Sequence, residues 1–163
     1  MRISVTFLSL GLLRIALAPS ARACTRVGYK GPDNTVITAR SMDWMSEIDP
    51  NIWVFPRGIQ HTGEVGPLSI EWTSKYGSIV ASSWDIATTD GMNETGLVAN
   101  LLWLGESEYP KFNPNGTKRG IAVSLWAQYI LDNFATVEEA VSYLKNEPFV
   151  IVSDYIPGTE RFT

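Results

Sequence analysis

The sequence predicts an α+β fold in one domain, with strands in its first part and helices near its end. Short β-prone runs separated by turn residues occupy the chain from residue 24 to about residue 104. Residues 120–134 then carry apolar side chains at helical spacing, and a capping box follows at residues 136–139. Strands followed by a helix pair are typical of a sheet with a helical layer over one face.

The first 23 residues have the pattern of a secretory signal peptide. Arg2 gives a positive start, residues 7–13 form an apolar run, and Ala21-Arg22-Ala23 is a small-residue cleavage site. The apolar run is too short for a membrane span. We therefore expect a mature chain of residues 24–163, in the periplasm or secreted, with no membrane attachment after cleavage.

Composition excludes several classes of protein. The 163 residues carry a formal charge of −4, and removal of residues 1–23, which hold three basic and no acidic side chains, leaves −7. An acidic chain is a poor partner for nucleic acid or an anionic membrane. The hydrophobic content of 45% and six tryptophans exclude a disordered chain.

The first predicted element is a β-hairpin. Residues 25–29 and 36–40 are β-prone, and residues 30–34 between them are a dense turn signal. Pairing of Tyr29 with Thr35 would place Arg40 opposite Cys24 at the open end of the hairpin. Asp43 would then lie just beyond the strand, within reach of the Cys24 amine.

Further short strands are predicted downstream at residues 52–55, 69–72 and 78–83. Residues 60–67 are predicted as a loop or hairpin end and residues 90–94 as a tight turn. Residues 97–104 form the most apolar run, which predicts one strand buried on both faces. Residues 105–118, rich in Pro, Asn and Gly, form a predicted loop.

The last part of the chain is predicted to form two helices and a final strand. The first helix covers residues 120–134. The second begins at Thr136, runs to about Asn146 and ends before Pro148, and residues 149–152 are extended. Nothing left in the chain covers the other face of the sheet.

Cys24 is the single cysteine and directly follows the predicted cleavage site, so no internal disulfide can form. It has three interpretations: a plain buried cysteine, a lipidated cysteine, or an N-terminal nucleophile. Ala21-Arg22-Ala23 is a poor fit to a lipidation signal. The N-terminal position favours the nucleophile, whose own amine, with a pKa near 7.7–8.0, would handle the proton.

Cys24, Arg40 and Asp43 form the predicted catalytic site. A guanidinium beside the thiol favours the thiolate, and a carboxylate can hold the α-amine in position. The alternative for Arg40 and Asp43 is a simple surface ion pair. His61 is the single histidine, which leaves almost no material for a histidine-based triad or a zinc site, and we expect no metal and no cofactor.

These residues resemble the choloylglycine hydrolase family, which includes penicillin V acylases and conjugated bile salt hydrolases. The resemblance rests on Cys24-Thr25-Arg26, on residues 38–44 (TARSMDW), on residues 90–97 (DGMNETGL), on Leu102-Trp103-Leu104 and on residues 136–140 (TVEEA). It implies an N-terminal-nucleophile hydrolase with αββα layers that cleaves linear amide C–N bonds. It also implies that Cys24 is the nucleophile, that Asp43 contacts its amine and that Arg40 supports the thiolate.

The chain departs from this family in two ways. Family domains are roughly twice as long, and their second half supplies another catalytic Asn and Arg, so residues 24–163 correspond to the N-terminal half only. Gram-positive bile salt hydrolases carry an oxyanion-binding Asn where an ungapped comparison places Trp103, with Asn100 three residues earlier. Trp44 and Trp103 then resemble pocket walls for an aromatic or acyl group, as in the exported Gram-negative branch. Core packing is the alternative role of each tryptophan.

The expected function is hydrolysis of a small-molecule amide through a thioester on Cys24. Penicillin V, an N-acyl homoserine lactone or a conjugated bile salt is the expected substrate, and a homo-oligomer is compatible with the sequence. A truncated, non-catalytic secreted remnant is one alternative, and it would expose apolar surface. A lipid-anchored binding module is another, and it would lack the free amine.

Overall fold

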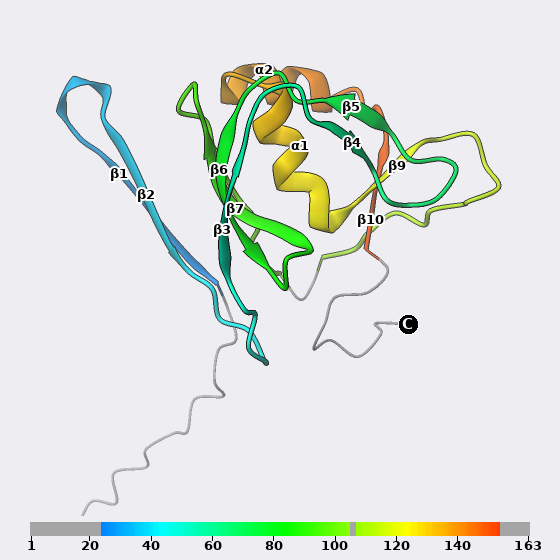
Figure 1. The fold of residues 1–163 in the computed structure, drawn as a ribbon, viewed down its shortest axis with the longest axis horizontal. Helices are drawn as coiled ribbons and strands as arrows, with labels where there is room; N and C mark the ends of the chain where they lie inside the picture. The colour runs from blue at the N-terminus through cyan, green and yellow to red at the C-terminus, as the bar shows by residue number, and fades with distance from the viewer. Residues whose placement is uncertain (1–23, 105–106, 154–163) are drawn as a thin grey trace, which may run out of the picture.

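The computed structural model describes residues 24–104 and 107–153, and residues 1–23, assigned above to a signal peptide, lie outside the described part. The α+β class is confirmed, with strands first and two α-helices late (Figure 1). The strands are β1 Thr25–Lys30, β2 Val36–Ser41, β3 Asn51–Phe55, β4 Gln60–Thr62, β5 Glu71–Thr73, β6 Ser78–Ser83, β7 Ala87–Asn93, β8 Val98–Asn100, β9 Gly120–Ala122 and β10 Val150–Val152. The helices are α1 Trp126–Asn133 and α2 Val137–Leu144, with 3₁₀ turns at Pro32–Asn34 and Val123–Leu125.

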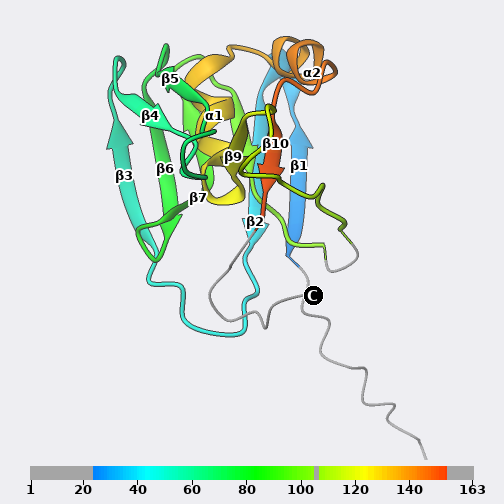
Figure 2. The same ribbon diagram turned by 90° about the vertical axis from the view of Figure 1, so that its right-hand side faces the viewer.

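The largest sheet has four antiparallel strands in the order β3-β6-β7-β8. Helix α1 packs against β7 and β8 on one face of this sheet, and α2 lies at one end of α1 (Figure 1). Figure 2 shows β3, β6 and β7 side by side, with the parallel pair β9–β10 in front of them. The β4–β5 hairpin joins β9 through the hydrogen bond from the Ile70 backbone N–H to the Gly120 carbonyl, 3.0 Å.

Helix α1 closes the main core. Gln128 and Asp132 face the sheet, and Ile121 and Leu131 are completely buried. The core cluster consists of Ile70, Leu97, Ile121, Tyr129, Phe134, Ala140 and Phe149. Asn93, at the end of β7, donates from its side chain to the carbonyls of Leu131 and Phe134 at 2.8 Å each, which fixes the helix to the sheet.

His61 lies on strand β4 and not in the loop predicted for residues 60–67. Its ring stacks on Trp72 at 5.2 Å, and its Nε2 lies 3.5 Å from the Asp132 carboxylate. Trp72 and Gln128 donate to the two oxygens of that carboxylate at 2.7 and 2.8 Å. Burial raises the pKa of Asp132 because the charged form loses its hydration, and these partners oppose the shift. The histidine therefore joins the core network that ties β4 and β5 to α1.

The capping box at the start of α2 is confirmed. The Thr136 Oγ1 accepts a hydrogen bond from the Glu139 backbone N–H at 3.2 Å, and the Glu139 carboxylate accepts from the Ala135 N–H at 2.8 Å.

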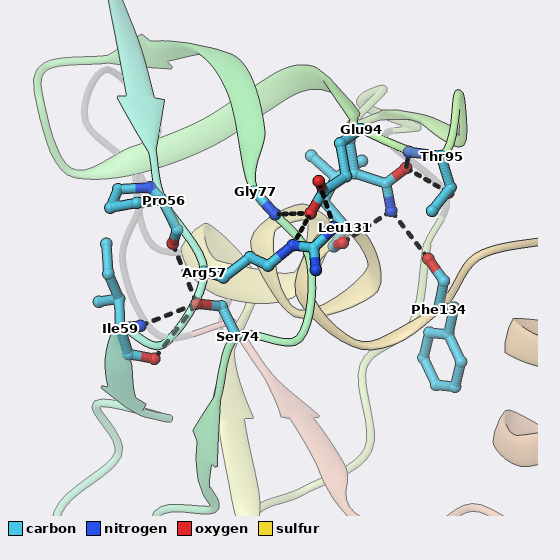
Figure 3. Close-up of polar contacts among 10 residues, drawn as sticks. Pro56, Arg57, Ile59, Ser74, Gly77, Glu94, Thr95, Leu131 and Phe134 are labelled. Atoms are coloured by element: carbon cyan, nitrogen blue, oxygen red, sulfur yellow. Dashed lines mark hydrogen bonds and ion pairs between the residues drawn. The ribbon is translucent and has the colours of Figure 1, made fainter.

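An ion pair joins the segment after β3 to the β7–β8 turn, where Figure 3 shows Arg57 directed at the Glu94 carboxylate. The Gly77 N–H donates to the same carboxylate at 2.7 Å.

Three predicted elements are wrong. The run 90–94 is not a turn, because β7 continues to Asn93 and the turn follows it. Gly91 is there for packing: a Cβ at that position would lie 2.6 Å from the Leu131 Cδ1 and 2.7 Å from the Val80 Cγ1. The run 97–104 is a strand only over β8, and Leu102 and Leu104 beyond it are exposed.

The third wrong element is the helix over residues 120–134, which begins only at Trp126. Gly120–Ala122 pairs in parallel with β10 as strand β9, so a short apolar run that fits either structure is decided by tertiary pairing. Helix α2 also ends at Leu144, slightly before the predicted end. The predicted strands 52–55, 78–83 and 149–152 match β3, β6 and β10 closely, whereas residues 69–72 give β5 two residues later.

The face of the four-stranded sheet turned away from α1 carries an exposed apolar row. Val54 pairs with Ile79, Ile79 with Met92, and Met92 with Val98, so these side chains lie side by side across the strands. Val54 is 73% exposed, Ile79 47% and Met92 48%. Within the described residues this face has no helical cover, as the sequence predicts.

Candidate active site

Cys24 directly precedes β1 and lines a pocket with residues from five other stretches of the chain. The pocket encloses about 90 Å³, and its lining is almost entirely apolar. The lining residues are Cys24, Met42, Trp44, Trp84, Ile86, Ala87, Thr89, Leu101, Leu102, Trp103, Tyr109, Val123 and Ser124. The Cys24 side chain is partly buried and carries a free thiol. A thiol beside an apolar cavity is placed to meet an apolar group bound in that cavity.

Three tryptophans dominate the pocket. Trp44 lies between the other two, with ring centroids 6.2 Å from Trp84 and 5.6 Å from Trp103, both in edge-to-face geometry. The sequence-predicted residues Trp44 and Trp103 therefore share one pocket with Cys24. Sequence reasoning missed Trp84, because nothing in the local pattern Ser83-Trp84-Asp85 marks it as different from a turn residue.

Arg40 is not paired with Asp43. Its Nε lies 3.0 Å from the Asp90 carboxylate of β7, and its Nη2 donates to the Leu101 carbonyl. The side chain is only 8% exposed, and its Nη1 is buried without a hydrogen-bond partner among the described residues. The predicted alternative of a surface ion pair with Asp43 is thus wrong, because the guanidinium is buried and its carboxylate partner comes from another strand.

Asn100 belongs to the same buried polar cluster. It pairs with Asp90 across β7 and β8, and its Nδ2 donates to the Asp90 carboxylate at 2.8 Å. Its Oδ1 is buried without a hydrogen-bond partner among the described residues. Asn100 does not line the apolar pocket, but the next residue, Leu101, does. The Leu101 carbonyl also accepts the hydrogen bond from the Arg40 guanidinium. The polar cluster of Arg40, Asp90 and Asn100 is therefore adjacent to the pocket, and Leu101 contacts both.

The hairpin register differs from the predicted one by two residues. Arg26 pairs with Arg40 and Thr25 with Ser41, so Arg40 does not lie opposite Cys24. The turn is the cause: Lys30 pairs with Val36, and the Gly31 N–H donates to the Thr35 carbonyl at 2.8 Å, which leaves residues 31–35 as the connection. Residues 33 and 34 adopt the left-handed conformation that Asp and Asn tolerate.

Asp43 lies in an exposed segment just beyond β2, and its Oδ2 accepts a hydrogen bond from the Ser41 hydroxyl at 3.3 Å. It is not among the residues that line the pocket. Tyr109 does line the pocket, and burial raises the pKa of its phenol because the charged form loses hydration. The part of the chain described here contains no group of three or more His, Cys, Asp or Glu placed to hold a metal ion. The same residues include no helix long and apolar enough to cross a membrane.

Comparison with known proteins identifies the family that has this fold. Residues 24–160 match the model of the linear amide C–N hydrolases, choloylglycine hydrolase family, and the chain belongs to that family. The family predicted from the sequence is thereby confirmed, and the solved structures described below confirm the predicted fold.

Two curated relatives match most of this chain. The chain is 49% identical over 168 residues to the penicillin V acylase of Pectobacterium atrosepticum, covering 98% of this chain and 45% of that protein. It is 31% identical over 142 residues to a bile salt hydrolase/transferase of Clostridium perfringens, covering 83% of this chain and 42% of that protein. The chain thus spans less than half the length of these relatives.

Solved structures agree with these relatives. The penicillin V acylase from Agrobacterium tumefaciens superposes with a TM-score of 0.74 at 58% identity, over 78% of this chain and 39% of that one. A mutant conjugated bile acid hydrolase from Clostridium perfringens gives a TM-score of 0.64 at 29% identity, over 85% of this chain and 41% of that one. The similarity therefore extends to enzymes named for two different kinds of amide substrate.

Proposed function

We propose that this chain forms the nucleophile-bearing part of an exported linear amide hydrolase that acts through Cys24 as its N-terminal residue. The observation that carries the proposal is the position of Cys24, directly before β1 and on the wall of an apolar pocket lined by three tryptophans. Cleavage after Ala23 would give this cysteine a free amine, and the enzyme would act in the periplasm or outside the cell. Membership of the linear amide C–N hydrolases supports the reaction class.

The proposed reaction has two steps. The Cys24 Sγ thiolate attacks the carbonyl carbon of the bound amide, and the C–N bond breaks as the protonated α-amine passes a proton to the leaving nitrogen. The acyl group stays on sulfur as a thioester. The α-amine, now neutral, takes a proton from water, and the resulting hydroxide attacks the thioester carbonyl. The C–S bond then breaks, which releases the carboxylic acid and restores the Cys24 thiolate beside the protonated amine.

The residues around Cys24 have supporting roles in this proposal. The Arg40 guanidinium, fixed by Asp90 and the Leu101 carbonyl, supplies positive charge that favours the thiolate. Asp43 would hold the α-amine once cleavage frees it. Trp44 and Trp103 bind the acyl group. Asn100 acts on the site through Asp90, because its Nδ2 donates to the carboxylate that pairs with Arg40.

The substrate classes follow from the named relatives and the shape of the pocket. Penicillin V and conjugated bile salts are the amides for which the relatives are named, and an N-acyl homoserine lactone offers a similar linear amide. An almost wholly apolar pocket favours the acyl part of such a molecule over its polar amine part.

A chain that begins at Cys24 can be compared with one that keeps a single extra residue, Ala23, before it. Both retain the thiol, but only the first has the cysteine amine, so the proposal predicts amide hydrolysis by the first and a loss of at least about a hundredfold in the second. The Cys24→Ala variant should be inactive. Equal activity in the two chains would rule out the N-terminal amine as the proton carrier.

A second candidate is a non-catalytic secreted remnant, and the exposed row Val54, Ile79 and Met92 favours it. A remnant of this kind would aggregate through its apolar face and would show no turnover with an intact thiol. Light scattering together with the activity of the chain that begins at Cys24 distinguishes the two candidates.

A further inference from the structure

The segment between β2 and β3, residues 42–50, carries Asp43, which the proposed function assigns to the amine of Cys24. Figure 2 shows this segment as the cyan loop from the end of β2 to the start of β3. Continuation of the hairpin register puts Cys24 opposite Met42, and Asp43 is the next residue. A hollow of about 340 Å³ lies along the segment and is lined by residues of the segment itself. Ties to other elements must therefore keep Asp43 in place.

The turn between β6 and β7 supplies these ties. The Ser83 hydroxyl donates to the sulfur of Met42 at 3.7 Å, at the start of the segment. The Trp84 backbone N–H donates to the Ile48 carbonyl at 2.7 Å, and its indole Nε1–H donates to the Glu47 carbonyl at 2.9 Å. Two consecutive residues of the turn thus hold the segment on both sides of Asp43.

The backbone of this turn is in a conformation that bulky residues rarely adopt. Trp84 and Asp85 have φ values of +53° and +52°, and the Ile86 N–H donates to the Ser83 carbonyl across them at 3.0 Å. Hairpin turns with two positive φ values normally carry Asn-Gly or Asp-Gly at these positions. A tryptophan there persists only where the surroundings determine its conformation.

Asp85 provides that restraint. Its Oδ1 accepts hydrogen bonds from Trp53 Nε1 at 2.9 Å, from Asn51 Nδ2 at 2.9 Å and from Ser82 Oγ at 3.1 Å. These bonds lower the pKa of Asp85, with the Trp53 bond as the largest cause, so the carboxylate remains charged and an acceptor. Asn51 directly follows the segment, so one carboxylate fixes both the turn and the end of the segment.

We propose that Asp85 is a positioning residue: it holds the turn at Trp84, the turn holds residues 42–50, and the segment keeps Asp43 beside the amine of Cys24. The inference rests on the proposed function, which assigns Asp43 to that amine. Asp85 does not line the pocket, so its effect passes through the segment. A carboxylate beside an amine favours the protonated amine. Release of the segment should therefore let the amine lose its proton at lower pH.

The first measurement asks whether Asp85 holds the segment. A glutamate-specific protease is added to the native exported protein, and mass spectrometry follows cleavage after Glu47. Asp85→Gly removes the acceptor, while glycine adopts the left-handed conformation freely. Cleavage after Glu47 should become at least about tenfold faster, because it follows the population of the open segment. Cleavage after Glu71, in β5, reports general unfolding and should not change.

Three further variants separate the hydrogen bonds from the turn itself. Asp85→Asn keeps the Oδ1 acceptor and should cleave at nearly the rate of the unaltered chain. Asp33→Gly is the matched control, because Asp33 has a φ of +56° in the exposed turn of the β1–β2 hairpin, and it should have no effect. Trp53→Phe removes one donor to Asp85 and should give a smaller change in the same direction. This variant decides the question if the urea midpoint shows that Asp85→Gly does not fold.

The second measurement asks whether the segment acts on the amine. Cys24 is the single cysteine, so ¹³C-cysteine labelling of the exported protein gives NMR signals from this residue alone, and its amine can be titrated without any turnover. Asp43→Asn gives the reference shift toward lower pH. Asp85→Gly should produce most of that shift, and Asp33→Gly none.

Two results would overturn the inference. One is unchanged cleavage after Glu47 in a folded Asp85→Gly chain. The other is faster cleavage with an unchanged amine titration in Asp85→Gly, although Asp43→Asn shifts that titration. A titration that Asp43→Asn itself leaves unchanged would contradict the role of Asp43 in the proposed function, and the inference would fail with it.

Discussion

The buried guanidinium of Arg40 lies 3.0 Å from the carboxylate of Asp90, although the two residues belong to different sheets. Arg40 comes from the β1–β2 hairpin and Asp90 from the middle of β7, in the four-stranded sheet. The ion pair therefore joins β2, the second strand of the hairpin, to the four-stranded sheet. The hairpin needs such a tie, because every residue of β1 is exposed.

Replacing Asp90 by Asn should destabilise the chain by roughly 3 kcal/mol, because a buried cation then lacks its counter-charge. Urea denaturation at pH 7 measures the change. Glu147→Gln is the matched control, since it removes one partner of the exposed Lys118–Glu147 pair at 3.6 Å, and such pairs contribute little. A similar small change in both variants would mean that the Arg40–Asp90 pair does not hold the hairpin.

Gly91 is predicted to tolerate no side chain. An alanine Cβ would lie within 3 Å of Leu131 and Val80, and overpacking of this kind costs about 1–3 kcal/mol. The comparison is Gly28→Ala in β1, where a Cβ meets nothing within 4 Å. The thermal unfolding midpoint of Gly91→Ala should be clearly lower than that of Gly28→Ala. An unchanged midpoint for Gly91→Ala would contradict the close approach of α1 to β7.

Glu94 should govern part of the acid sensitivity of the fold. The Arg57 hydrogen bond and the Gly77 N–H lower the pKa of this carboxyl to about 2 from a usual value of 4.5. Because the folded pKa is depressed, the contribution to stability is present above about pH 4.5 and is lost as the pH falls toward 2. In Glu94→Gln, the urea midpoint should therefore change less between pH 5 and pH 2.5 than it does in the unaltered chain. This difference between the two chains should shrink in high salt. An unaltered acid limb would show that the clamp between Arg57 and Glu94 does not form in solution.

Removal of the N-cap of α2 by Thr136→Ala should cost about 1 kcal/mol, because the Glu139 N–H then loses its acceptor. Ser142→Ala, inside the same helix and exposed, is the control and should be neutral or slightly stabilising. The difference between the two urea midpoints is the measurement. No difference would mean that the cap does not contribute to the helix.

Local sequence signals predict the elements whose structure is set locally. The strand β6 and the Thr136 cap depend on residues close in sequence, and each forms where predicted. Tertiary pairing decides the others: Gly120–Ala122 becomes a strand because β10 lies beside it, and Gly91 stays in β7 because α1 needs the space. Neither partner is visible in the local pattern.

The same distinction separates the predicted site residues from those that were missed. The position of Cys24 after a cleavage motif identifies it, and the family motifs place Trp44 and Trp103, which all line one pocket. Asp90 and Trp84 were missed because their roles depend on contacts with Arg40 and Trp44 across 50 and 40 residues of chain. Hairpin register also depends on the turn conformation, and a two-residue difference moves Arg40 away from the position opposite Cys24.

The most direct test of the account is the intact mass of the exported protein before and after incubation with penicillin V. The account predicts a mass that begins at Cys24, one rapidly alkylated thiol, and a transient addition of the acyl group that is absent in Cys24→Ala. A mass that keeps residues 1–23, or one that carries a diacylglycerol on the cysteine, would contradict the N-terminal nucleophile. A correct start with no acyl addition from penicillin V, an N-acyl homoserine lactone or a conjugated bile salt would contradict catalysis and favour the remnant.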